Sequence, residues 1–66
     1  MSILIIKNIN ATKIKLNLTL KEIAFATEVS DATVCRYLGG LQNIPDYWIE
    51  RFCTAFHVSV EWLKTG

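Results

Sequence analysis

The chain has 66 residues, of which 52% are hydrophobic and 20% are charged, with seven lysines or arginines against six aspartates or glutamates and a formal net charge of +1. A chain of this length forms a single domain, here residues 1–66, and its apolar fraction is that of a folded globular protein rather than a disordered one. The longest apolar run, residues 3–6, is far shorter than the roughly 20 residues that span a bilayer, and no secretion signal is recognised, so we expect a cytoplasmic protein with no membrane partner.

Cysteine and histidine are too sparse to suggest a metal site. Cys35, Cys53 and His57 are the whole set. With no CxxC pair and a single histidine, neither a zinc site nor a disulfide framework is predicted. We interpret Cys35 as a small residue on a helix face rather than a redox sensor, Cys53 as a core residue, and His57 as a structural or solvated residue. The chain has no paired carboxylate and base, glycine-rich phosphate loop or Ser-His-Asp arrangement, so we expect no enzyme, small-molecule substrate or cofactor.

The first predicted element is a helix within the first sixteen residues. Its apolar residues form an approximate stripe at helical spacing: Ile5, Ile6, Ile9, Ile14 and Leu16. The β-branched start over residues 3–6 is also compatible with a short extended arm, because periodicity alone does not separate a strand from a buried helical turn.

Two short helices with clear start signals follow. Thr19 and Glu22 form a capping box, which begins a helix that ends near Thr27. The apolar positions of this helix share one face and are Ile23, Ala24 and Thr27. Ser30 is a fresh N-cap, so a third helix runs from about Asp31 to Leu38.

The third helix is expected to direct Val34, Tyr37 and Leu38 to the core, and Gly39 and Gly40 to end it in the left-handed conformation. Only about three residues separate it from the helix before it. The pair must therefore cross at a steep angle, and Ala24 allows the close approach. This is the geometry of a helix-turn-helix over about residues 19–38.

The last two predicted helices complete an all-α chain. Pro45 suits the first turn of a fourth helix, whose core positions repeat at helical spacing: Ile49, Phe52, Cys53 and Phe56. Ser59 caps a fifth helix with Trp62 and Leu63 on its buried side. Tyr47 and Trp48 fit either a partner anchor or the cover of the core, of which the second is the commoner role.

A spaced set of residues within residues 14–40 matches a known pattern. The matching residues are Leu18, Thr19, Glu22, Ile23, Ala24, Val29, Ser30, Thr33, Val34, Arg36 and Gly40. By these residues the segment resembles the Cro/C1-type helix-turn-helix of phage and bacterial repressors. The tail over residues 56–66, with its Val-Ser, Trp-Leu and final glycine, is similar to the closing helix of that family, so the resemblance covers nearly the whole chain.

The resemblance implies a compact five-helix, lambda-repressor-like fold that binds operator DNA as a homodimer. It places Ser30 at the cap of the recognition helix and Arg36 towards the groove or its phosphates. The base-reading end would consist of Asp31, Ala32 and Thr33. On position alone, Arg36 fits a solvated surface residue equally well, and Asp31 suits the dipole at a helix start.

Several positions depart from the family pattern. Leu20 replaces the glutamine that commonly holds a phosphate, and residues 41–44 lack the usual lysine or arginine. The frequent ion pair between the first and third helices maps onto Lys13 and Leu38 and cannot form. Glu28 replaces the turn glycine, so it must adopt a left-handed conformation or reshape the turn.

These departures leave a second function open. The face that would meet DNA presents apolar or small residues around Asp31, with Lys21 and Arg36 as its main cations. The apolar or small residues are Leu20, Ala32, Cys35, Leu41 and Ile44. Such a face favours an antirepressor, which keeps the fold but binds and inactivates a partner repressor. The residues expected to contact either DNA or this partner are Thr19, Leu20, Lys21, Ser30, Asp31, Ala32, Thr33, Cys35, Arg36, Leu41, Gln42 and Asn43.

Overall fold

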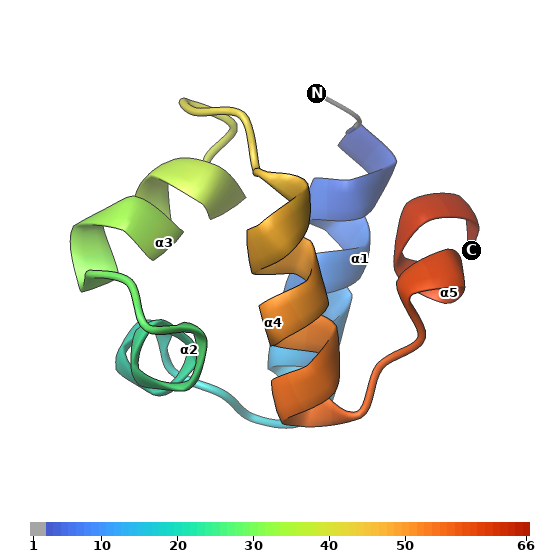
Figure 1. The fold of residues 1–66 in the computed structure, drawn as a ribbon, viewed down its shortest axis with the longest axis horizontal. Coiled ribbons are helices and arrows are strands. Elements are labelled where there is room, and N and C mark those ends of the chain that lie inside the picture. The colour runs from blue at the N-terminus through green and yellow to red at the C-terminus, as the bar shows by residue number, and fades with distance from the viewer. Residues whose placement is uncertain (1–2) are drawn as a thin grey trace.

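The computed structural model describes residues 3–66, and within that range it contains five helices and no strand (Figure 1). The all-helical class predicted from the sequence is confirmed. The Cα radius of gyration is 10.4 Å, close to the roughly 11 Å expected of a compact chain of this length.

Helix α1 covers Ile3–Lys15, so residues 3–6 are helical and not an extended arm. Its buried side consists of Ile9 and the polar residues Asn8 and Thr12. The predicted apolar stripe is wrong in its second half, since Ile14 is 79% exposed and Leu16 is 45% exposed. Five residues after Ile9, the helix has turned by about 140°, which directs Ile14 away from the core. Leu16 follows the last helical residue.

Helix α2 covers Leu20–Thr27 and begins with the predicted capping box. The amide of Glu22 donates to Thr19 Oγ1 at 3.1 Å, and the amide of Thr19 donates to Glu22 Oε1 at 2.9 Å. The buried residues are Ile23, Ala24 and Thr27, as predicted. The small Ala24 side chain is 2% exposed, and this face of α2 packs against both α3 and α4.

Helix α3 covers Asp31–Leu38, the predicted bounds, with Val34 and Tyr37 buried and Leu38 half-buried. Its end differs in detail from the prediction. Gly39 has a right-handed φ of −85°, and only Gly40, with φ 74°, takes the left-handed conformation. The amide of Leu41 then donates to the carbonyl of Arg36 at 2.9 Å, closing the helix end.

Helices α4 (Asp46–Phe56) and α5 (Val60–Thr65) complete the chain. Pro45 is the N-cap of α4 rather than a residue of its first turn, because its extended ψ of 151° is not helical. Ser59 caps α5 as predicted, accepting from the amide of Trp62 at 3.2 Å. Leu63 is fully buried, but the prediction for Trp62 is wrong, since 42% of it is exposed.

The core lies between the helices and is built around aromatic rings. Trp48 is fully buried and stacks on Phe52 at 5.4 Å between ring centres. Its aromatic contact with Tyr37 is edge-on, at 5.1 Å between ring centres. Trp48 therefore belongs to the core, whereas Tyr47 beside it is 53% exposed. Within residues 3–66, the buried hydrophobic residues are Ile9, Ile23, Ala24, Val34, Tyr37, Ile44, Trp48, Ile49, Phe52, Cys53 and Leu63.

The helices are arranged so that α1 and α4 lie in the middle, with α3 on one side and α5 on the other (Figure 1). The contacts agree with this view, because α1 packs against both α3 and α5, while α3 and α5 share no contact. Within residues 3–66, no helix combines the length and apolar character that crossing a membrane requires.

Candidate functional site

The outward face of α3 brings together four of the residues predicted to form the site. Asp31, Ala32, Cys35 and Arg36 are all exposed, whereas Val34 on the opposite side is fully buried. Their spacing of one, four and five positions is that of a single helical face. The packing of α3 on α1 and α2 therefore fixes which of its residues face the solvent.

The start of α3 is held by a local hydrogen-bond pair. Ser30 Oγ accepts from the amide of Thr33 at 3.2 Å and lies 2.8 Å from Thr33 Oγ1. The first amides of a helix have no partner inside it, so those of Asp31 and Ala32 point outwards with the positive end of the helix dipole. This end can donate to an anion or a base edge, but the exposed Asp31 carboxylate stands beside it.

The predicted residues at the start of α2 lie on a separate element from this face. Thr19 is engaged in the capping box and Lys21 is exposed. Leu20 is half-buried and packs against the core, so it contributes less apolar surface than the sequence suggested.

The loop that follows α3 is exposed over most of its length. Leu41 is 82% exposed, and Gln42 and Asn43 are exposed as well. Ile44 is buried, with only 8% of it accessible, so the prediction that it lies on the outer face is wrong. It joins the core because the chain must turn inwards there to start α4. In Figure 1 this loop lies at the top of the view and α2 at the bottom left, at opposite ends of α3.

The charges are divided unevenly between the helices. Residues 19–43 carry two cations, Lys21 and Arg36, against three anions, Glu22, Glu28 and Asp31. The three charged residues of α1 are instead all lysines: Lys7, Lys13 and Lys15. The α2–α3 region therefore has a net negative formal charge, while the excess of positive charge lies on α1.

The two cysteines differ as predicted. Cys35 is exposed on α3 and Cys53 is buried in α4, where burial raises the pKa of its thiol against the smaller, opposite effect of Lys64. Residues 3–66 contain no cluster of histidine, cysteine, aspartate or glutamate that could hold a metal ion.

Comparisons with protein-family models, curated proteins and solved structures found no match to this chain.

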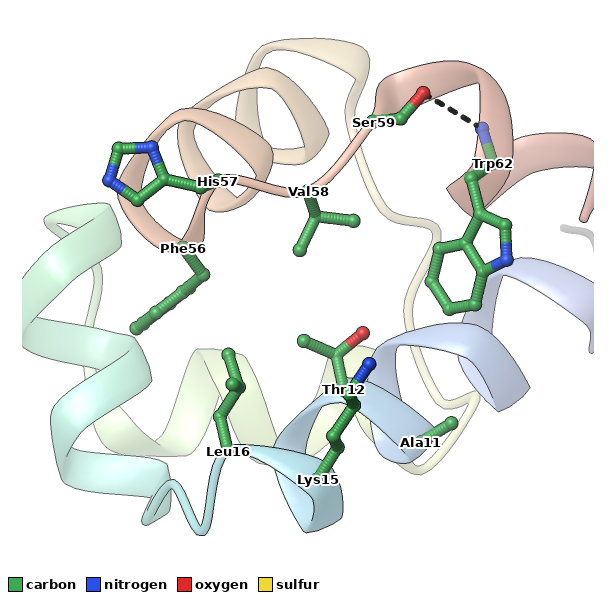
Figure 2. Close-up of a pocket in the computed structure, with 9 residues that line it drawn as sticks. All are labelled: Ala11, Thr12, Lys15, Leu16, Phe56, His57, Val58, Ser59 and Trp62. Atoms are coloured by element: carbon green, nitrogen blue, oxygen red, sulfur yellow. Dashed lines mark hydrogen bonds between the residues drawn. The ribbon is translucent and has the colours of Figure 1, made fainter.

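Two features of the surface were missed from the sequence. Phe25 is 89% exposed on α2, and a groove of about 360 Å³ opens between α1, the end of α4 and α5 (Figure 2). Helical spacing indicates the exposure of Phe25, because this residue lies outside the face formed by Ile23, Ala24 and Thr27. The groove has no such local signal, since it depends on how residues far apart in the chain are packed together.

Proposed function

We propose that the chain is a transcriptional regulator of the Cro/C1 class, in which α2 and α3 act as a helix-turn-helix and the outward face of α3 binds operator DNA. One observation carries this proposal. Two eight-residue helices pack against each other with only residues 28–30 between them, and the second helix turns Asp31, Ala32, Cys35 and Arg36 away from the core.

In this mechanism the start of α3 enters the major groove, where an α-helix fits. Asp31 accepts from a cytosine amino group, Thr33 lies beside it at the base-reading end, and Arg36 contacts a guanine edge or a phosphate. Lys21 at the start of α2 contacts the backbone of DNA. A homodimer would read two half-sites about one helical turn, roughly 34 Å, apart.

The salt dependence of binding tests the proposal directly. Protein is titrated onto DNA from the control region of its own gene and onto a scrambled duplex, each at two salt concentrations. With Lys21 and Arg36 as the cations of the face, about two phosphates are neutralised per protomer, which predicts a slope of log K against log salt near −2 per protomer. Equal binding to the two duplexes would contradict sequence-specific recognition.

The Arg36→Ala variant is expected to weaken operator binding by about 1–3 kcal/mol if the guanidinium reads a base. If it meets only a phosphate, binding falls equally on all sequences and the salt slope drops by about one unit. Lys64→Ala is the matched control, because Lys64 is exposed on α5, outside the α2–α3 face, where it pairs with Asp46 at 3.8 Å. An unchanged affinity for Arg36→Ala would remove this residue from the interface.

A second candidate function is antirepression, and it is favoured by the exposure of Leu41 and by the low positive charge of residues 19–43, in which two cations stand against three anions. In this case the outward face of α3 binds a partner repressor instead of DNA. The same titration is run with purified repressor encoded beside the chain's own gene. A stable protein complex without any DNA complex at high micromolar protein supports antirepression, and specific DNA binding with a salt slope contradicts it.

A further inference from the structure

The groove seen in Figure 2 has an apolar interior between segments that are far apart in the sequence. Leu16 enters it from the end of α1, Phe56 and Val58 from the end of α4 and the turn that follows, and Trp62 from α5. Its volume of about 360 Å³ is enough for a large side chain. Both Leu16, 45% exposed, and Trp62, 42% exposed, leave apolar surface in contact with water.

Further exposed apolar side chains stand beside the groove along the outer side of α1, with the exposed Lys7 between them. Ala11 lines the groove, and Ile14, one turn further on, is 79% exposed. Ile3, on the same side three turns earlier, is 81% exposed. With its 13 residues, α1 is about 20 Å long. A surface of this length exceeds a small ligand and fits a segment of polypeptide.

The charges along this surface are all positive. Lys15 lines the groove and Lys7 lies on the exposed side of α1, while none of the residues that line the groove and none in α1 is acidic. An apolar surface bordered by lysines is complementary to an apolar segment that carries carboxylates.

Hydrogen bonds from a buried side chain of α1 hold α5 beside it and so fix the shape of the groove. Asn8 Nδ2 donates to the carbonyl of Leu63 at 3.0 Å and to that of Trp62 at 3.3 Å. Ile9 and Leu63 are both fully buried in the core. The two walls are therefore fixed before any partner arrives, which lowers the entropic cost of binding.

We infer that the groove and the outer side of α1 form a docking surface for an acidic, amphipathic segment of a partner protein, with an apolar side chain in the groove and carboxylates beside Lys15 and Lys7. The hollow favours a polypeptide over a membrane surface, because a bilayer meets protruding apolar side chains and cannot fill a concave site. No residue of α2 or α3 lines the groove, so the inference does not depend on the proposed function.

The test uses an acidic peptide about as long as α1, with leucine and phenylalanine on one helical face and glutamate on the other. Its control peptide has lysine in place of every glutamate. Binding is followed by ¹⁵N NMR of the whole chain, where the indole signal of Trp62 reports on the groove and that of the buried Trp48 serves as a reference. We expect saturable shifts at Trp62 with the acidic peptide, and binding about fivefold weaker with the lysine peptide.

Variants at exposed positions separate the two contributions. Lys15→Glu is expected to weaken binding of the acidic peptide about fivefold, and Leu16→Gln at least about tenfold, by removing apolar contact without changing the charge. Arg36→Glu makes the same charge reversal on α3 and is expected to leave peptide binding unchanged. The proposal is overturned by equal affinity for the two peptides, by shifts confined to α3, or by no saturable shift at millimolar peptide.

Two other occupants give distinct results in parallel measurements. Anionic phospholipid vesicles that shift Trp62 where the peptide does not would assign the surface to a membrane and overturn the inference. Sedimentation that shows a dimer dissolved by Leu16→Gln would assign it to a second copy of the chain, with the same consequence.

Discussion

A single amide side chain, Asn8, links the first helix to the last. It is buried, and its Nδ2 donates to the carbonyls of Trp62 and Leu63 near the end of α5, of which the Trp62 carbonyl also accepts from the amide of Gly66 at 2.7 Å. Without it, the buried hydrogen bond to the Leu63 carbonyl is lost, while the Trp62 carbonyl keeps its bond from Gly66. This is a costly loss, since an unpaired buried polar group costs about 1–3 kcal/mol.

We therefore expect Asn8→Ala to lower the free energy of unfolding by about 1–3 kcal/mol, measured by urea denaturation. Asn10→Ala is the matched control, because Asn10 Nδ2 donates only within α1, to the carbonyl of Ile6 at 3.0 Å. Both variants gain the same helix propensity from alanine, so their difference isolates the link between α1 and α5. Equal effects of the two substitutions would show that this link adds nothing to stability.

Four of the five helices are followed by the same kind of turn. A left-handed residue follows each of α1, α2, α3 and α4, and these residues are Asn17, Glu28, Gly40 and His57. After three of them, the next residue, Leu18, Val29 or Val58, packs on the core. After α3 the equivalent residue is Leu41, which stays 82% exposed. The residue after the left-handed position thus anchors three of these turns to the core. At the fourth turn, this residue is an apolar side chain that stays exposed.

Glu28 adopts this conformation with φ 62° and has a Cβ, which makes the end of α2 a strained position. Glu28→Gly is expected to raise the free energy of unfolding by about 0.5–1 kcal/mol. Glu28→Ala retains the Cβ and also removes the charge, so it should give no such gain. Thermal unfolding of both variants measures the difference, and a gain shared equally by alanine and glycine would trace the effect to the charge instead of the backbone.

Elements whose signals are local were predicted well. The capping box at Thr19, the cap at Ser30 and the bounds of α3 depend on neighbours three or four residues away, which the sequence displays directly. Which residues are buried in the core was predicted less well. Ile44 was expected on the surface and is buried, whereas Trp62 was expected in the core and is partly exposed. The burial of each depends on where a loop or a short helix packs on elements that are distant in the sequence.

The candidate site shows the same division between local and long-range information. The outer face of α3 follows from helical spacing, and Asp31, Ala32, Cys35 and Arg36 lie on it as predicted. The groove beside Trp62 does not follow from spacing, since it joins residues 11–16 to residues 56–62. Local signals therefore place residues on a helix, and only the packing of the whole chain creates a hollow between helices.

Two core residues are expected to make the fold less stable at alkaline pH. Burial raises the pKa of Cys53 above its ordinary 9.0 and that of Tyr37 above its ordinary 10.0, the latter with a further contribution from Tyr47. Both groups stay protonated in the fold at pH values where the unfolded chain has released the proton. Their contribution to stability is complete below the unfolded pKa and is lost as pH rises from there towards the folded pKa.

We expect the free energy of unfolding to fall above about pH 9, by at most about 1.4 kcal/mol per pH unit for each group. Urea denaturation at a series of pH values measures this slope. Cys53→Ala should flatten the first part of the fall even where its smaller side chain lowers stability at every pH. Cys35→Ala removes an exposed thiol and should leave the slope unchanged. If both variants keep the slope of the parent chain, the loss of stability arises elsewhere than at the buried thiol.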